Sequence, residues 1–216
     1  MINNYSCNCN HFDFSKREYT YWEDRNVTIG EKNIIDFMQK NFALNNKKIL
    51  HVGIGNSYLH TQLKNNNYIY GITVSNKELN FSKKFHSKNY LTFFCDKHSN
   101  KLNSIFNNIK FDYIIDNNLK SYVCCYKSFE NMFKNFKNLL NHNGLIITSI
   151  EGMNWQKKLV PKLTFDLKRF FYFKLKEVDI NHSDNIFSIK EAESISKKFS
   201  LTLFNNKEIC YFSRNF

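Results

Sequence analysis

One stretch, residues 47–80, constrains the fold of this chain more than any other. It opens with a short apolar run, Lys48–Val52, that has the length and the β-forming residues of a buried strand. Gly53 and Gly55 follow at once, and a segment of helical length leads to a second apolar run, Tyr68–Val74. This order predicts a parallel β-α-β unit with a glycine turn after its first strand.

A β-α-β unit predicts a ligand site at the carboxyl ends of its strands. Glycines in the first turn let the backbone approach a ligand, and a helix N-terminus offers unpaired N–H groups. A Gly-x-Gly also occurs in ordinary tight turns, so that alternative stays open here. Beyond the second strand, Ser75 predicts an N-cap for a helix over Asn76–Phe85, and Glu78 would complete a capping box.

Strands and helices continue to alternate up to residue 150, which is typical of a parallel sheet with helices on both faces. A first helix is expected over Glu31–Asn41 with Thr28 as its N-cap, and Asn143-Gly144 is expected to separate the last helix of this series from the fifth strand. The further helices expected are Asn103–Asn107, Tyr126–Leu140 and Ser188–Phe199, and the further strands are Tyr90–Cys95, Phe111–Ile115, Leu145–Ile150, Leu201–Phe204 and Glu208–Ser213.

Composition favours a single domain. The chain has 216 residues, of which 42% are apolar, and its one proline and six glycines form no linker.

The net charge of +12 suits nucleic acid, an anionic membrane or an anionic substrate. The abundance of Lys, Asn, Ile and Phe offers a compositional alternative, because codons rich in A and T encode these residues.

The six cysteines match no disulfide framework, and Met1–Asn10 lacks the apolar core of a signal peptide. No run approaches the ~20 apolar residues of a membrane span. We therefore expect a cytoplasmic chain with reduced thiols.

Cys7-x-Cys9-x-His11 is too tightly spaced for a standard zinc knuckle, and no second ligand pair stands out. We therefore predict no metal site.

Five short motifs, in their order along the chain, resemble the class I S-adenosylmethionine-dependent methyltransferases from Tyr19 to the C-terminus. They are Ile49-Leu50-His51-Val52-Gly53-Ile54-Gly55-Asn56 for the first motif, Gly71-Ile72-Thr73-Val74-Ser75 for the second strand, Asp96 after the third, Phe111-Asp112 opening the fourth and Asn143-Gly144-Leu145 opening the fifth.

The resemblance implies an α/β fold, a Rossmann-like three-layer sandwich. Its seven-stranded, mostly parallel sheet would have the order 3-2-1-4-5-7-6 and an antiparallel last strand. Residues 1–45 would form an arm and first helix, 46–150 the core that binds S-adenosylmethionine (SAM), 151–187 a substrate lid, and 188–216 a helix and hairpin completing the same domain. The product would be S-adenosylhomocysteine (SAH).

The resemblance also implies a set of cofactor-binding residues, with two departures from the family's pattern. His51 replaces the acid of the first motif, and Thr73 replaces the acid that binds the ribose. Glu78, at a position where some relatives use Gln to hold the ribose, would restore a carboxylate acceptor. The full set is Tyr21, Trp22, His51, Gly53, Gly55, Asn56, Thr73, Glu78, Asp96 and Asp116.

Methyl transfer depends mainly on positioning, and a general base helps only where the acceptor must lose a proton. The candidates are Glu151, His182 and Asp116, at or beyond the ends of the fourth and fifth strands. Two nucleic-acid chemistries are disfavoured. The D/N/S-P-P-Y/F/W motif of amino-methylating enzymes is replaced after Ile115 by Asp-Asn-Asn-Leu, and the only proline, Pro161, precedes Lys162 rather than cysteine.

A basic and aromatic segment, Trp155–Lys176, stands where the family places a substrate lid and would suit an anionic acceptor. We therefore expect a SAM-dependent methyltransferase acting on a small anionic metabolite. The alternatives are an RNA-modifying methyltransferase and a catalytically silent binding subunit with the same fold. The aromatic residues of the segment also fit packing against the domain or a partner subunit, so a homodimer is a further expectation.

Overall fold

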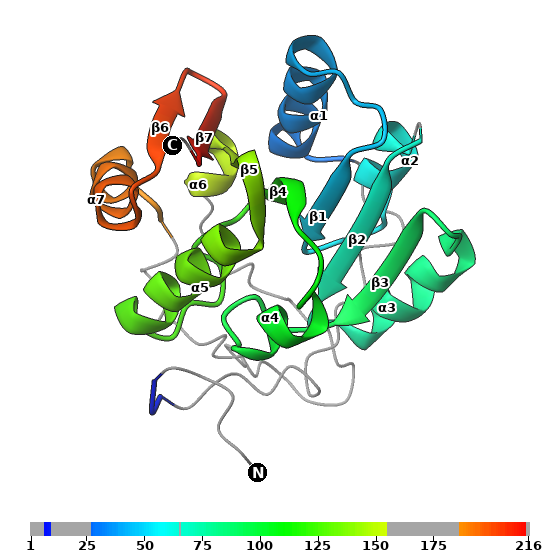
Figure 1. Cartoon of the computed structure of the whole chain (residues 1–216), viewed down its shortest axis with the longest axis horizontal. Helices are drawn as coiled ribbons and strands as arrows, with labels where there is room; N and C mark the ends of the chain where they lie inside the picture. Colours follow the sequence, from blue (N-terminus) through cyan, green and yellow to red (C-terminus); the bar gives the residue numbers. More distant parts are fainter. Residues whose placement is uncertain (1–6, 10–26, 65, 155–185, 215–216) are drawn as a thin grey trace, which may run out of the picture.

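The computed structural model describes residues 7–9, 27–64, 66–154 and 186–214, which form one seven-stranded sheet with helices on both faces (Figure 1). The strands are β1 (Lys48–Val52), β2 (Tyr68–Thr73), β3 (Tyr90–Phe94), β4 (Phe111–Asp116), β5 (Leu140–Ser149), β6 (Thr202–Asn205) and β7 (Ile209–Ser213). The helices are α1 (Ile29–Asn41), α2 (Tyr58–Leu63), α3 (Asn76–Ser82), the 3-10 helix η2 (Lys83–Phe85), α4 (Lys101–Ile105), α5 (Tyr126–Leu139), α6 (Ile150–Met153) and α7 (Ile189–Phe199).

The strand order is β3-β2-β1-β4-β5-β7-β6, and this confirms the fold expected from the sequence. The first five strands pair in parallel, whereas β7 runs antiparallel to both β5 and β6. The chain winds outward in one direction from β1 and in the other from β4. Such a reversal of strand order leaves a crevice at the carboxyl ends of the two central strands.

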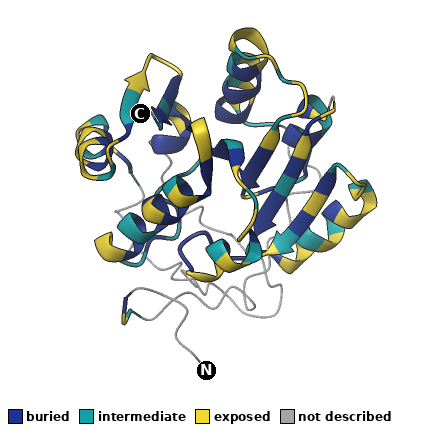
Figure 2. Ribbon diagram, viewed as in Figure 1, coloured by how far each residue is buried: buried dark blue, intermediate teal, exposed yellow. Residues whose placement is uncertain are grey.

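Two apolar layers hold the helices against the sheet. One layer joins α4, α5 and α7 to one face of the sheet, and the other joins α1 and α2 to the opposite face. The helices are buried on one side and exposed on the other, while the central strands are buried throughout most of their length (Figure 2). On α5, Phe133 packs edge-on against Phe129 and Phe212, with ring centroids 5.2 and 5.1 Å apart.

Side-chain caps begin α1 and α7, and the sequence predicts the first of these caps, at Thr28. Thr28 Oγ1 accepts a hydrogen bond from the Glu31 N–H at 3.1 Å. At the start of α7, Ser188 and Glu191 form a reciprocal capping box. Because each cap satisfies N–H groups that have no partner within the helix, these residues define where α1 and α7 start.

The fifth strand differs from its prediction. It begins at Leu140, directly after α5, and Asn143-Gly144 lies within it. Asn143 has a φ of 60°, and the pairing of β5 with β4 shifts register in this region. A Cβ atom at Gly144 would lie 2.9 Å from the Phe111 carbonyl oxygen. The pair therefore forms an irregularity in a longer strand and does not separate helix from strand.

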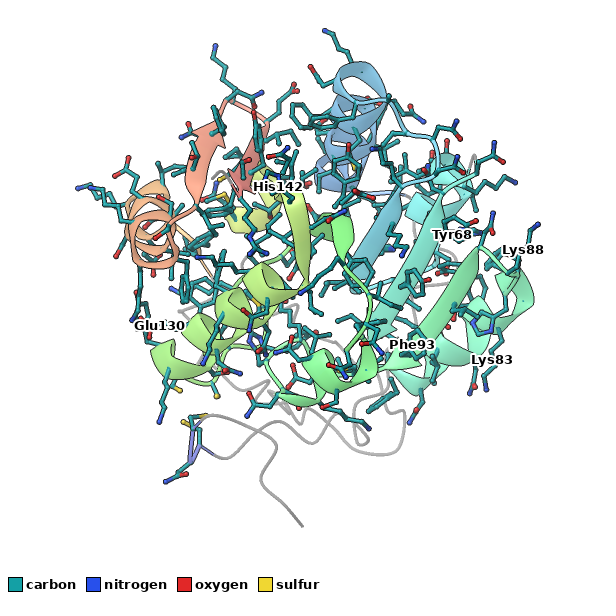
Figure 3. All side chains as sticks on the ribbon, in the orientation of Figure 1. Tyr68, Lys83, Lys88, Phe93, Glu130 and His142 are labelled. Carbon is teal, nitrogen blue, oxygen red and sulfur yellow. The ribbon has the colours of Figure 1, made fainter. Side chains whose placement is uncertain are left out.

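The end of the sheet at which the parallel strands begin, opposite the crevice, is more open to solvent. Tyr68 starts β2 there with 39% of its surface exposed, and it is labelled in Figure 3. Among the described residues, no helix is both long enough and apolar enough to cross a membrane.

Candidate functional site

A cavity of about 210 Å³ lies at the carboxyl ends of β1, β2, β3 and β4, at the reversal of strand order. It brings together most of the residues that the sequence singled out. Its lining includes His51, Gly53, Gly55, Thr73, Glu78, Asp96, Asp116 and Glu151. Asn56 is not part of the lining, and its Oδ1 accepts a hydrogen bond from the Tyr58 N–H at 3.2 Å. Tyr21, Trp22 and His182 lie outside the described residues.

The glycine turn after β1 gives the cavity an open backbone wall. Gly53 has a φ of +74° and Gly55 a φ of +50°, a region that residues with a Cβ atom rarely adopt. The Gly53 N–H donates to the Ile72 carbonyl at 2.9 Å, which ties the turn to β2. A Cβ atom at Gly53 would meet nothing within 4 Å. The turn therefore leaves space beside its backbone that a ligand can fill.

The end of β2 carries a buried hydroxyl–carboxylate pair. Thr73 Oγ1 donates to Glu78 Oε2 at 2.6 Å and accepts from the Ser75 N–H at 3.0 Å. Ser75 Oγ accepts from the Glu78 N–H at 3.3 Å, so Ser75 is the N-cap of α3 as predicted. The reciprocal half of the expected capping box is replaced, because Thr73 takes the Ser75 N–H and binds the Glu78 carboxylate.

His51 occupies the end of β1 as a neutral side chain. It is 5% exposed, and burial, assisted by the neighbouring charge of His60, lowers the pKa of His51 to about 3. Its Nδ1 atom is buried and has no hydrogen-bond partner among the described residues. A buried polar atom without a partner is costly, so this nitrogen is a candidate contact for a ligand in the cavity.

At the end of β4, Asp116 is held by a buried ammonium group. Lys97 Nζ lies 2.7 Å from Asp116 Oδ2, and Asp116 Oδ1 accepts from the Asn118 N–H at 3.0 Å. Lys97 also donates to the Asn118 carbonyl at 2.7 Å and to Ser121 Oγ at 3.0 Å. Both carboxylate oxygens of Asp116 thus have partners within the protein, and the network ties together the loops that follow β3 and β4.

The loop after β3 supplies residues that the sequence prediction missed. Asp96 was expected here, and its Oδ1 accepts from the His98 N–H at 2.9 Å. His98 is 1% exposed and lines the same cavity, and burial lowers its pKa. Its Nε2 lies 3.1 Å from the Ser121 carbonyl, which favours a proton on Nε2 and leaves Nδ1 as an acceptor. Lys97 and His98 directly follow Asp96 in the sequence. Their position next to a predicted site residue could have indicated that they also belong to the site.

Glu151 lies just beyond the end of β5, in the short helix α6. Its Oε2 accepts a hydrogen bond from the Gly30 N–H, in the first turn of α1. A carboxylate at this position stabilises the positive end of the helix. Gly30 has no room for a side chain, because a Cβ atom would lie 2.3 Å from Ser149 Oγ. Glu151 therefore joins α6 to α1 at the edge of the cavity.

No protein-family model and no curated protein matches the sequence. Solved structures do resemble the fold. A TehB-like SAM-dependent methyltransferase from Corynebacterium glutamicum superposes with a TM-score of 0.57 at 13% identity, covering 88% of this chain and 90% of its own. The N-methyltransferase NodS from Bradyrhizobium japonicum, in complex with SAH, gives a TM-score of 0.52 at 10% identity, covering 86% and 85%.

The chain has the class I methyltransferase fold. A third similar structure limits what this fold implies. The [4+2]-cyclase SpnF superposes with a TM-score of 0.52 at 12% identity, and this chain spans 58% of its length. A methyltransferase fold therefore serves more than one chemistry, and function has to be argued from the site.

Proposed function

We propose that this chain binds SAM in the cavity and transfers its methyl group to a small-molecule acceptor. The observation that carries the proposal is the buried Thr73–Glu78 pair at the end of β2, with 2.6 Å between Thr73 Oγ1 and Glu78 Oε2. A carboxylate only accepts hydrogen bonds, and it can accept from both ribose hydroxyls of SAM at once. Glu78, which lies in the first turn of α3 and lines the cavity, therefore supplies the carboxylate that Thr73 lacks.

Other residues of the cavity fit the remaining parts of the cofactor. The open wall at Gly53 leaves room for close approach to the turn after β1. His51 Nδ1 is a buried polar atom without a partner among the described residues, and it would bind the amino-acid end of the cofactor. Asp96, and the Nδ1 acceptor of His98, would face the adenine at the end of β3.

When bound, SAM supplies a methyl group that its sulfonium already activates. The chain would then act mainly by holding the acceptor atom in line and by excluding water. The general base stays a prediction for Glu151, His182 and Asp116. Glu151 and Asp116 already accept hydrogen bonds within the protein, so a reaction that depends on positioning is the simpler proposal.

An anionic acceptor is the finer part of the proposal. Its support is the run of basic residues between Trp155 and Lys176, which lies outside the described residues, together with the net charge of +12. The RNA alternative differs in one measurable respect, because phosphate contacts weaken steeply as salt concentration rises. RNA affinity that is absent at low salt would favour the small-molecule acceptor. The proposed homodimer can be checked by sedimentation.

A catalytically silent subunit is the second candidate, since His51 and Thr73 depart from the family's acids. Isothermal titration calorimetry with SAM and SAH tests both functions. The proposal predicts binding of both compounds in the micromolar range, and no heat with either at millimolar concentration would refute it. If SAM binds, turnover assays with pools of small acids then separate an enzyme from a silent binding subunit.

A further inference from the structure

The structure brings together four cysteines from two distant parts of the chain. Cys7 and Cys9 lie near the N-terminus, and Cys124 and Cys125 immediately precede α5 (Figure 1). Their four Sγ atoms all lie within 4.8 Å of one another. The sequence prediction found no second ligand pair beside Cys7 and Cys9, and the fold supplies one. His11 of the original pattern lies outside the described residues.

We propose that Cys7, Cys9, Cys124 and Cys125 form a tetrathiolate zinc site, separate from the cavity that would hold SAM. Zinc takes four thiolates in a tetrahedron with Zn–S bonds of about 2.3 Å, and this places neighbouring sulfurs about 3.8 Å apart. The Cys7–Cys124 and Cys124–Cys125 sulfur separations are 3.6 and 3.9 Å. These two separations are thus already those of a zinc site, and the other pairs lie within 4.8 Å.

The spacing also discriminates against other uses of four thiols. A disulfide brings its sulfurs to about 2.05 Å, and none of the six cysteines, all of which the structure describes, forms a disulfide. An iron–sulfur cluster divides its ligands between separate irons, whereas these four sulfurs all lie within 4.8 Å of one another, close enough to bind a single ion. Soft thiolate ligands in a tetrahedral set favour zinc among the common divalent ions.

The surroundings suit the negative charge of a zinc tetrathiolate. Cys125 is the N-cap of α5, a helix of 14 residues, and its Sγ accepts a hydrogen bond from the Ser128 N–H at 3.4 Å. Hydrogen bonds to ligand sulfurs and the positive end of a helix both stabilise anionic metal sites. Cys7 is buried, and the other three thiols are half-buried, so the group is shielded yet reachable by an entering ion.

The site would join the N-terminal segment to the rim of the cavity. Ser121 and Tyr122 line the cavity and stand just before Cys124 in the chain. Zinc bound here would restrain that loop and hold residues 7–9 against it. Zinc would restrain the loop whichever ligand binds in the cavity. An experiment can therefore refute the zinc site without refuting the methyltransferase proposal, and the reverse.

Metal analysis of the purified full chain tests the proposal. The protein is desalted and its zinc measured by mass spectrometry, then replaced by cobalt to record the absorption of a tetrahedral thiolate site. We expect one zinc per chain in the wild type, loss of at least nine-tenths of it in Cys9→Ser and in Cys124→Ser, and full retention in the matched control Cys210→Ala, whose buried thiol lies in β7.

Circular dichroism of each variant shows whether it has folded, and the wild-type measurements keep the test decisive if a variant does not fold. Stoichiometric zinc with the cobalt spectrum of four thiolates supports the site. Trace zinc in wild-type protein with accessible, reduced thiols would overturn it, as would a disulfide between the two pairs of cysteines. Zinc that remains in both serine variants would also overturn it.

Discussion

The ends of β2 and β4 each hold a buried carboxylate beside the cavity, but the partners of these carboxylates differ. Glu78, next to β2, accepts from the hydroxyl of Thr73, whereas Asp116, at the end of β4, is paired with the ammonium group of Lys97. A hydroxyl leaves a carboxylate its charge, while a buried ammonium neutralises it. We infer that Glu78 serves the ligand and that Asp116 holds the loops together.

Lys97→Met should have the largest effect on stability. It leaves the Asp116 carboxylate buried without its cation, and unpairing a buried charge costs about 3–5 kcal/mol of unfolding free energy. Urea denaturation measures the loss. The double variant Lys97→Met/Asp116→Leu should recover most of it, because it removes both charges. A loss below about 1 kcal/mol in the single variant would contradict the structural role of this pair.

Glu78→Ala should act mainly on ligand affinity. If Glu78 accepts the ribose hydroxyls, the lost charge-assisted hydrogen bonds cost about 1.5–3 kcal/mol, which weakens SAH binding about tenfold or more. The loss of unfolding free energy should be about 1–2 kcal/mol, because the buried Thr73 hydroxyl loses its acceptor. Calorimetry with SAH measures the affinity, and Lys77→Ala, an exposed neighbour on α3, is the control. Unchanged affinity together with lower stability would mean that the Glu78 carboxylate only holds Thr73 in place.

His51, near the end of β1, differs from Glu78 and Asp116 because its side chain is neutral. Because the pKa of folded His51 lies near 3, below its ordinary value of 6.5, the unfolded chain binds the proton more readily. The contribution of neutral His51 to the free energy of unfolding is therefore fully present above pH 6.5, and it is lost as the pH falls from 6.5 toward 3. In His51→Gln the slope of unfolding free energy against pH should decrease by about 1.4 kcal/mol per unit in that window. An unchanged slope would contradict the neutral state.

Thr73→Val is the mildest change, because it keeps the shape of the side chain and removes only the hydroxyl. The Glu78 carboxylate and the Ser75 N–H each lose a partner, so we expect a loss of about 1–2 kcal/mol of stability. SAH affinity should fall by less than in Glu78→Ala, since the carboxylate remains. A larger loss of affinity than in Glu78→Ala would mean that Thr73, and not Glu78, holds the ligand.

Local sequence patterns were sufficient for the alternation of strands and helices, for the caps at Thr28 and Ser75 and for the glycine turn at Gly53. The strand order was expected only from the resemblance of the ordered motifs to the methyltransferase family. The extent of β5 was not predictable from Asn143-Gly144, because an irregularity inside a strand uses the same residues as a turn.

The site was less predictable, since its decisive contacts join distant residues. The Lys97–Asp116 ion pair links two loops, and the thiols of Cys7 and Cys124 meet across 117 positions. Such pairs carry no periodicity or spacing that a single sequence reveals. Glu78 is an intermediate case. Its position in the chain suggested both a cap and a ligand contact, and only the hydrogen bond with Thr73 shows where the carboxylate lies.

The central claim, that Glu78 binds a ribose, is tested most directly by removing each partner in turn. Calorimetry would compare SAH with an analogue that lacks the ribose 2′-hydroxyl, on wild-type protein and on Glu78→Gln. If Glu78 binds the ribose, loss of the hydroxyl should weaken binding about tenfold in the wild type and less than about twofold in the variant. Equal losses in both proteins, or no binding of SAH to the wild type, would contradict it.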